Sequence, residues 1–149
     1  MRSRTTIAAM TALFMLIALF PAQATAAPKV EGPDKMVVQH ILIGFKRSIA
    51  GKKITRTKRD AQVLAESLLR RIEEGEDFDA LVKEFTDDQY PGFIAMANRG
   101  VDPLGGMSRD DMVDGFGDVS FSLEVGEVGI CPWHGRKSPF GWHIIKRME

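Results

Sequence analysis

Two short apolar runs, each with one histidine near its middle, constrain the fold of this chain more than any other feature. The first is Val37–Ile43 and contains His40, and the second is Phe140–Arg147 and contains His143. Runs rich in β-branched and aromatic residues are typical of strands that are covered on both faces. Adjacent central strands bring the two imidazoles side by side, so we expect the chain between them to supply lid, linker and pocket wall.

The N-terminal residues have the pattern of a cleavable secretory signal. Arg2 and Arg4 precede an apolar run over 7–20, and a proline and several small residues follow it. The run is shorter than the roughly 20 residues that span a membrane. We therefore expect a signal peptide over 1–26, a flexible linker over 27–35, one domain over 36–149 and no stable membrane span after cleavage. An uncleaved N-terminal anchor is the alternative.

Charge and cysteine content exclude several classes of protein. Cys131 is the sole cysteine, so the chain forms no intramolecular disulfide, and no cysteine follows the apolar run to carry a lipid. Loss of the signal removes two arginines and leaves 18 basic against 20 acidic residues. This balance argues against bulk nucleic-acid binding. We expect an exported monomer, either periplasmic or extracellular.

Helical periodicity follows the first histidine run. Apolar residues recur at helical spacing over 61–72, after a capping pair formed by Thr57 and Asp60. A second helix is predicted over 78–85, with Asp77 as its N-cap. Both helices are expected to cover one face of the sheet.

The second half of the chain contains shorter elements. Residues 86–106 hold so many prolines and glycines that we expect irregular structure over most of this segment. Ser108 is expected to cap a short helix through residue 112, and a second short segment follows over 116–123. Strands are predicted over 128–133 and 142–148, joined by a hairpin loop.

Several ordered motifs accompany the two histidine runs. They are Gln39–Leu42, Glu74–Leu81, Glu84–Asp87, Leu104–Arg109 with Met112 and Phe116, Phe121–Leu123, Gly126–Val128 and Gly141–Lys146. Together they resemble the parvulin (PpiC-type) family of peptidyl-prolyl cis/trans isomerases, or rotamases, over roughly residues 35–149. The resemblance implies an α+β fold, with an antiparallel sheet of about four strands, the two histidine strands central and four helices around them.

The resemblance also implies an enzyme that accelerates rotation about X-Pro bonds during the folding of exported proteins. Such a reaction needs no metal or cofactor, because only a partial double bond must be weakened, against a barrier of about 18–20 kcal/mol. It needs an apolar cup for the proline ring, a polar surround that favours the twisted amide and a groove for the flanking peptide. The expected partners are proline-containing segments of unfolded or folding exported proteins.

Specific residues follow from the family pattern. Leu104, Met112 and Phe116 are expected to form the proline cup. The polar surround is expected to hold His40 and His143 as paired imidazoles that share a proton, Asp88 beside the isomerising carbonyl, and Thr86 and Ser138 as candidate hydroxyl partners. Lys52 and Lys53, in the basic segment 46–59, are candidate contacts for acidic substrates, and a merely solvated loop is the alternative.

Other interpretations of these residues stay open. Without the family pattern, a methionine and a phenylalanine at helical spacing are ordinary core residues, as is a histidine in an apolar strand. A metal site made of His40, Asp88, Cys131 and His143 has no supporting Cys-x-x-Cys or His-Glu-x-x-His spacing. A parvulin fold that binds unfolded chains without isomerising them is the main alternative, because segment 86–106 is longer than in the family, with Tyr90–Met96 as the apparent insertion.

Overall fold

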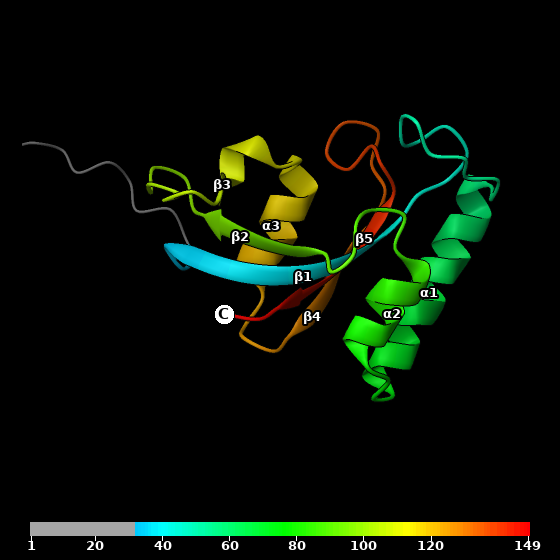
Figure 1. Cartoon of the computed structure of the whole chain (residues 1–149), viewed down its shortest axis with the longest axis horizontal. Helices are drawn as coiled ribbons and strands as arrows, with labels where there is room; N and C mark the ends of the chain where they lie inside the picture. Colours follow the sequence, from blue (N-terminus) through cyan, green and yellow to red (C-terminus); the bar gives the residue numbers. More distant parts are fainter. Residues whose placement is uncertain (1–31) are drawn as a thin grey trace, which may run out of the picture.

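Five strands form one sheet in the computed structural model, which describes residues 32–149 (Figure 1). The strands are β1 Lys35–Ile43, β2 Phe93–Ala97, β3 Met107–Ser108, β4 Val128–Cys131 and β5 Trp142–Arg147. The helices are α1 Lys58–Glu73, α2 Phe78–Phe85 and α3 Asp114–Ser122, with a 3-10 helix over Arg109–Asp111. The strand order is β3-β2-β1-β5-β4, so the two histidine strands, β1 and β5, are neighbours inside the sheet.

Antiparallel pairing of β1 with β5 determines which side chains share a face. His40 lies opposite Ile145, and Leu42 lies opposite His143. Because side chains alternate between the faces of a sheet, these four project from the same face. The α+β class and the central position of the histidine strands are therefore confirmed.

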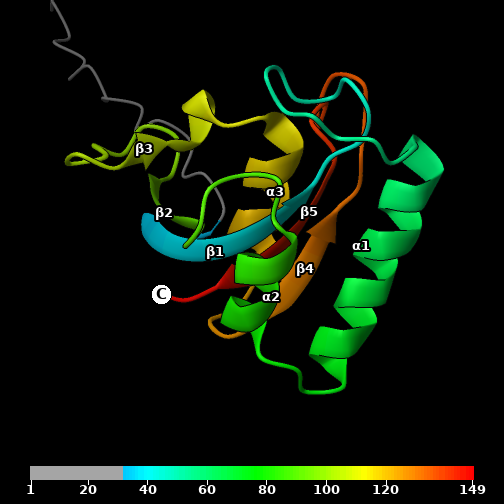
Figure 2. The same cartoon turned by 45° about the vertical axis from the view of Figure 1, so that its right-hand side comes forward.

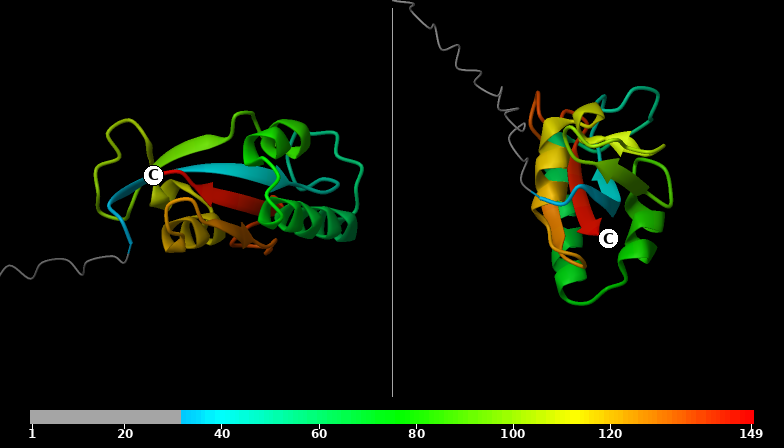
Figure 3. Two further views of the ribbon diagram at one scale, coloured as in Figure 1. Left: turned by 90° about the horizontal axis from the view of Figure 1, so that it is seen from below. Right: turned by 90° about the vertical axis from the view of Figure 1, so that its left-hand side faces the viewer.

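The helices divide between the two faces of the sheet (Figure 2). α1 and α2 pack against one face through residues such as Leu68 and Leu81, in a core that also contains Ile41 and Ile144. The other face is covered by α3, whose Phe116 is buried beside β1 and β5. Two layers of helices thus enclose the sheet, as the views in Figure 3 show.

Both predicted helix starts are confirmed. Thr57 accepts a hydrogen bond from the backbone of Asp60, whose carboxylate in turn accepts one from the Thr57 backbone, which makes a complete capping box at α1. Asp77 caps α2 by accepting from the Ala80 N–H at 2.8 Å. Such caps satisfy backbone donors that have no partner within the helix.

Segment 86–106 is irregular over most of its length, as expected, but it also contains a strand that the sequence did not indicate. It contains β2, which pairs with β1 from Lys35 to Gln39 and carries Ile94 and Met96 into the core. β3 then adds to β2 in parallel, so the sheet is mixed and has five strands, while three α-helices and a 3-10 helix replace the four helices expected. A strand this short is stabilised by its long-range partner, which local breaker residues do not reveal.

The signal peptide expected over 1–26 and most of the expected linker lie outside the described residues. Within residues 32–149, no helix combines the length and apolar character needed to cross a membrane.

Gly141 allows β5 to approach the end of β1. Its φ is 151°, and an added Cβ would collide with the carbonyl oxygen of Ile43. We expect Gly141→Ala to lower the free energy of unfolding by about 2–3 kcal/mol, measured by urea denaturation, because backbone must move. Gly135→Ala is the matched control, because its nearest neighbour would be 4.0 Å away. Equal stability of the two variants would contradict this interpretation of the β1–β5 junction.

Candidate active site

A cavity of about 200 Å³ lies on the α3 side of the sheet. The residues that line it are His40, Leu42, Asp88, Ile94, Met107, Asp111, Met112, Val113, Phe116, Phe140 and His143. They come from β1, β2, β3, β5, α3 and the loops between these elements. The cavity therefore gathers residues that lie more than a hundred positions apart in the sequence.

Phe116 and the two histidines form the back of this cavity. The rings of His40 and His143 lie 5.9 Å apart, centroid to centroid. Phe116 packs edge to face against both, at 5.3 Å from His40 and 5.2 Å from His143. All three side chains are almost fully buried, so the aromatic contacts fix the orientation of both imidazoles.

Hydrogen bonds on both ring nitrogens orient His40. The Gly92 carbonyl lies 3.0 Å from Nδ1 and accepts the His40 backbone N–H as well. Because a carbonyl can only accept, Nδ1 carries a proton. Nε2 lies 3.2 Å from Oδ2 of Asp88, so this contact is a hydrogen bond only when a further proton lies between the two groups. His40 thus directs its Nε2 edge at the Asp88 carboxylate.

Asp88 lies at the rim of the cavity, where its side chain is 46% exposed. The hydrogen bond with His40 is the main cause that lowers the pKa of Asp88, with smaller contributions from electrostatic interaction with His40 and Lys52 and from a backbone hydrogen bond of Gln89. Partial burial opposes this effect and raises the pKa. Asp88 is therefore a carboxylate at neutral pH, partly desolvated and fixed in direction.

His143 has a different environment. Burial lowers the pKa of His143 to about 3, and repulsion by His40 acts in the same direction. Neither ring nitrogen has a hydrogen-bond partner within residues 32–149. The structure therefore does not show the expected proton shared between the two histidines. His143 is a neutral ring that faces the cavity beside Phe116.

In the described residues, neither candidate hydroxyl group is hydrogen-bonded to a histidine ring. Thr86 accepts hydrogen bonds from the backbone N–H groups of Leu42 and Asp88, at 3.1 and 3.3 Å. Ser138 is fully buried and donates to the Gly141 carbonyl at 2.9 Å. Thr86 and Ser138 thus hold the backbone next to the site, and neither lines the cavity.

Two of the three residues expected to form the proline cup line the cavity, and one does not. Met112 and Phe116 lie at the cavity as expected, whereas Leu104 is 76% exposed and lines a separate hollow near the start of β1. Ile94, Met107 and Phe140 supply apolar walls that the sequence pattern did not indicate. Met107 and Phe140 stand within or next to the motifs already noted, while Ile94 belongs to the unexpected strand β2.

The basic segment 46–59 is only partly available to a ligand. Arg56 pairs with Asp87, which also accepts from the Gly44 N–H at 2.8 Å. Lys52 and Lys53 are exposed, and Lys52 acts electrostatically on Asp88. Their contact with acidic substrates stays a prediction. In the described part of the chain, no cluster of three or more His, Cys, Asp or Glu is arranged to hold a metal ion.

A polar network behind the cavity fixes the loop that bonds His40. Asp79 of α2 accepts from Gln39 at 2.7 Å and from the Tyr90 hydroxyl at 2.9 Å. Gln39 also donates to the Pro91 carbonyl at 2.9 Å. The apparent insertion at 90–96 therefore contributes to the site, because its Gly92 carbonyl bonds His40.

Comparisons with known proteins identify the family to which the chain belongs. Residues 25–149 match the family described as "PPIC-type PPIASE domain". The chain is 29% identical over 116 residues to Chaperone SurA of Methylobacillus flagellatus, covering 78% of this chain and 22% of that protein. It is 34% identical over 124 residues to a putative peptidyl-prolyl cis-trans isomerase, dodo, of Drosophila melanogaster, covering 78% of this chain and 68% of the other. The chain thus spans about a fifth of its SurA relative.

One solved structure extends the likeness to the fold. The crystal structure of PrsA from Bacillus subtilis superimposes with a TM-score of 0.51 at 27% identity, over 78% of this chain and 35% of that chain.

The buried neutral state of His143 has a measurable consequence for stability. Its pKa is about 3 in the folded protein, against an ordinary value of 6.5 in an unfolded chain, so the unfolded chain binds more protons between these values. The free energy of unfolding therefore falls as the pH falls from about 6 to 4, by up to about 1.4 kcal/mol per pH unit. We expect His143→Phe and His143→Gln to flatten this slope by that amount in urea denaturation. If the stability of both variants depended on pH as steeply as that of the wild type, this would contradict the assignment of His143 as a buried neutral ring.

Proposed function

Because the chain belongs to the PPIC-type peptidyl-prolyl isomerase family, the parvulins, we propose that it accelerates cis/trans isomerisation of X-Pro bonds in folding polypeptides. The observation that carries this proposal is the cavity in which an apolar cup adjoins the His40–Asp88 pair. The cup suits a proline ring, and the carboxylate at its rim suits the amide that precedes the ring.

Binding of the proline ring is assigned to Met112, Phe116 and Met107. Phe116 offers a rigid ring that the two imidazoles hold in place. Methionine side chains adapt their shape, so Met107 and Met112 can close around a five-membered ring in either isomer and in the twisted state between them. A cup of this kind lets the ring stay fixed while the preceding residue rotates.

Asp88 is assigned a role in electrostatics, with no covalent step. A planar amide places partial negative charge on its oxygen through resonance, and twisting the bond removes this charge and localises the lone pair on nitrogen. A carboxylate close to that oxygen therefore destabilises the planar state more than the twisted one. The apolar walls strengthen the effect, because they lower the local dielectric and favour the less polar twisted amide.

The alternative is a binding module that holds unfolded chains without isomerising them. Among the relatives, one is named a chaperone and another a foldase. The same cup serves either activity, since both begin by gripping a proline-containing segment. The two candidates differ only in whether rotation becomes faster.

An exchange experiment on a short peptide tests the proposed reaction. We expect wild-type protein to broaden or exchange the cis and trans NMR signals of an Ala-Pro peptide without a coupled protease. Asp88→Asn and Met112→Ala should each lower kcat/KM by about tenfold, or ~1.4 kcal/mol of transition-state stabilisation. Neither side chain is part of the deeply buried core, so both variants are expected to fold.

Asp34→Asn is the matched control for Asp88→Asn, because Asp34 is exposed and lies before β1, away from the cavity. Its activity should equal that of the wild type. Peptide binding without any acceleration by the folded wild type would reject the isomerase and favour the binding module. An effect of Asp34→Asn as large as that of Asp88→Asn would reject the role of Asp88.

We further propose that the protein acts on exported chains outside the cytoplasm. The support is the signal pattern of Arg2, Arg4 and the apolar run over 7–20. Expression of the full chain should yield an exported product that begins near Ala27, measured by fractionation and intact mass. A product that retains residues 1–26 in the cytoplasm would overturn this proposal.

A further inference from the structure

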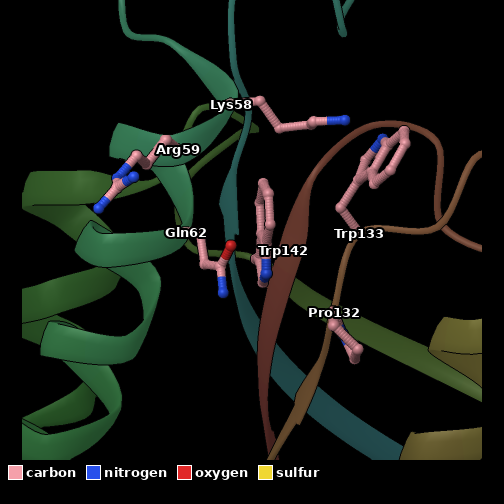
Figure 4. Close-up of a pocket in the computed structure, with 6 residues that line it drawn as sticks. All are labelled: Lys58, Arg59, Gln62, Pro132, Trp133 and Trp142. Carbon is pink, nitrogen blue, oxygen red and sulfur yellow. The ribbon is translucent and has the colours of Figure 1, made fainter.

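A second concave surface lies between the start of α1 and the start of β5 (Figure 4). We call it the aromatic groove; its volume is about 390 Å³, and its lining residues are Lys58, Arg59, Gln62, Pro132, Trp133 and Trp142. Trp142 precedes His143 in β5, so the two side chains project to opposite faces of the sheet. The groove is therefore separated from the candidate active site by the sheet itself.

The floor of the groove is aromatic and rigid. The Trp142 ring is 6% exposed, and Phe45 packs against it and against Trp133 at 6.3 and 6.0 Å between ring centroids. Lys58 places its Nζ 3.8 Å from the centre of the Trp133 ring. Tryptophan faces and a cation close to them form a surface that suits side chains with both apolar and acidic character.

The groove continues along α1 beside the edge strand β4. A second section of about 340 Å³ shares Trp142 with the first and adds Leu69, Arg70 and Ile130. Figure 2 shows α1 running alongside β4. The combined length suits an extended segment of several residues better than a compact small molecule.

Within residues 32–149, no strand pairs with the outer edge of β4, so this edge offers unpaired backbone groups along the same path. Arg147 donates its N–H to the Glu127 carbonyl at 3.0 Å. Because hydrogen-bonded and non-hydrogen-bonded residue pairs alternate along two antiparallel strands, this bond determines which residues of β4 direct their backbone groups toward β5. The backbone groups of Val128 and Ile130 consequently point away from β5. β4 is the last strand of the sheet within residues 32–149. An extended peptide can add to such an edge through main-chain hydrogen bonds.

The charges around the groove indicate which kind of partner it can bind. Lys58, Arg59 and Arg70 line it and are exposed, and in the described part of the chain none of them forms a salt bridge. Glu66 is the one carboxylate among the lining residues of the two sections, and it accepts from Gln62 at 2.9 Å. The excess of positive charge complements a negatively charged partner.

We propose that the aromatic groove and the edge of β4 bind an extended acidic segment of a polypeptide, independently of proline. Apolar side chains of that segment occupy the tryptophan-lined floor, its carboxylates approach Lys58, Arg59 and Arg70, and its backbone pairs with β4. A client chain can then be held on one face of the sheet while a proline elsewhere in it reaches the cavity on the other face.

Intrinsic fluorescence tests this directly, because both tryptophans of the chain lie in the groove. The probe is a capped, proline-free octapeptide of alternating glutamate and valine, with glutamine and lysine versions as comparisons. We expect saturable binding of the glutamate peptide, with a Kd about tenfold lower than that of the lysine peptide. Equal affinity for all three peptides, or no saturable signal, would overturn the proposal.

Charge reversal locates the binding site. Lys58→Glu and Arg70→Glu should each raise the Kd about fivefold or more, because the peptide loses an attractive charge and meets a repulsive one. Lys83→Glu is the matched control, an exposed residue of α2 that does not line the groove, and should leave the Kd unchanged. An equal loss of affinity in the Lys83→Glu control would show that the effect depends only on net charge. That result would reject the groove as the binding site.

Backbone NMR supplies the second readout. The amide signals of Val128 and Ile130 are expected to shift on addition of the glutamate peptide, while those around His40 stay in place. Shifts confined to the candidate active site would overturn the proposal. The same applies if these amides shift with protein concentration alone, because the occupant would then be a second copy of the chain.

Discussion

The antiparallel pairing of β1 with β5 is the interaction on which the rest of the structure depends. It sets His40 and His143 two positions apart on one face, at a separation that a single phenylalanine ring can bridge. The pairing requires close approach of the two backbones at Gly141. The Ser138 hydroxyl stabilises the preceding hairpin, because it donates a hydrogen bond to the Gly141 carbonyl. A slip of β5 by one residue against β1 would turn His143 to the opposite face, under α1 and α2, and separate it from His40.

The site places polar groups in apolar surroundings at a cost in stability. His143 is buried without a hydrogen-bond partner in the described residues, and such a group destabilises the folded state. The neutral His143 ring also forms part of the cavity wall beside Phe116. At the other histidine, the Gly92 carbonyl and the Asp88 carboxylate hold the His40 ring, and the network around Asp79 holds the loop that carries Gly92. The cavity thus combines apolar walls with two carboxylates, Asp88 beside His40 and Asp111, which accepts from the Ser108 N–H at 3.0 Å.

Alternation along β5 places different side chains on the two faces of the sheet. His143 faces the cavity, and its neighbour Trp142 faces the aromatic groove, so one strand carries both surfaces. α1 and α2 leave the edge beside β4 open, and α3 forms part of the cup. A rigid sheet between the two surfaces keeps their separation constant. In the proposed mode of binding, one polypeptide contacts the cavity and the aromatic groove at two places along its length.

The sequence by itself determined the elements whose signals are local. The apolar runs around His40 and His143 indicated the central strands, and Thr57 and Asp77 marked the starts of α1 and α2. The resemblance to the family, and not the spacing alone, pointed to Met112 and Phe116, which line the cavity. Tertiary structure alone decided the remaining features.

Strand β2 arises in a segment full of breakers, Ile94 and Met107 line the cavity in place of Leu104, and the Gly92 carbonyl fixes His40. The physical reason is the sequence separation between the residues that interact. Caps and periodicity act within a turn or two of chain, whereas these features depend on contacts between residues some fifty positions apart, which exist only once the sheet has formed.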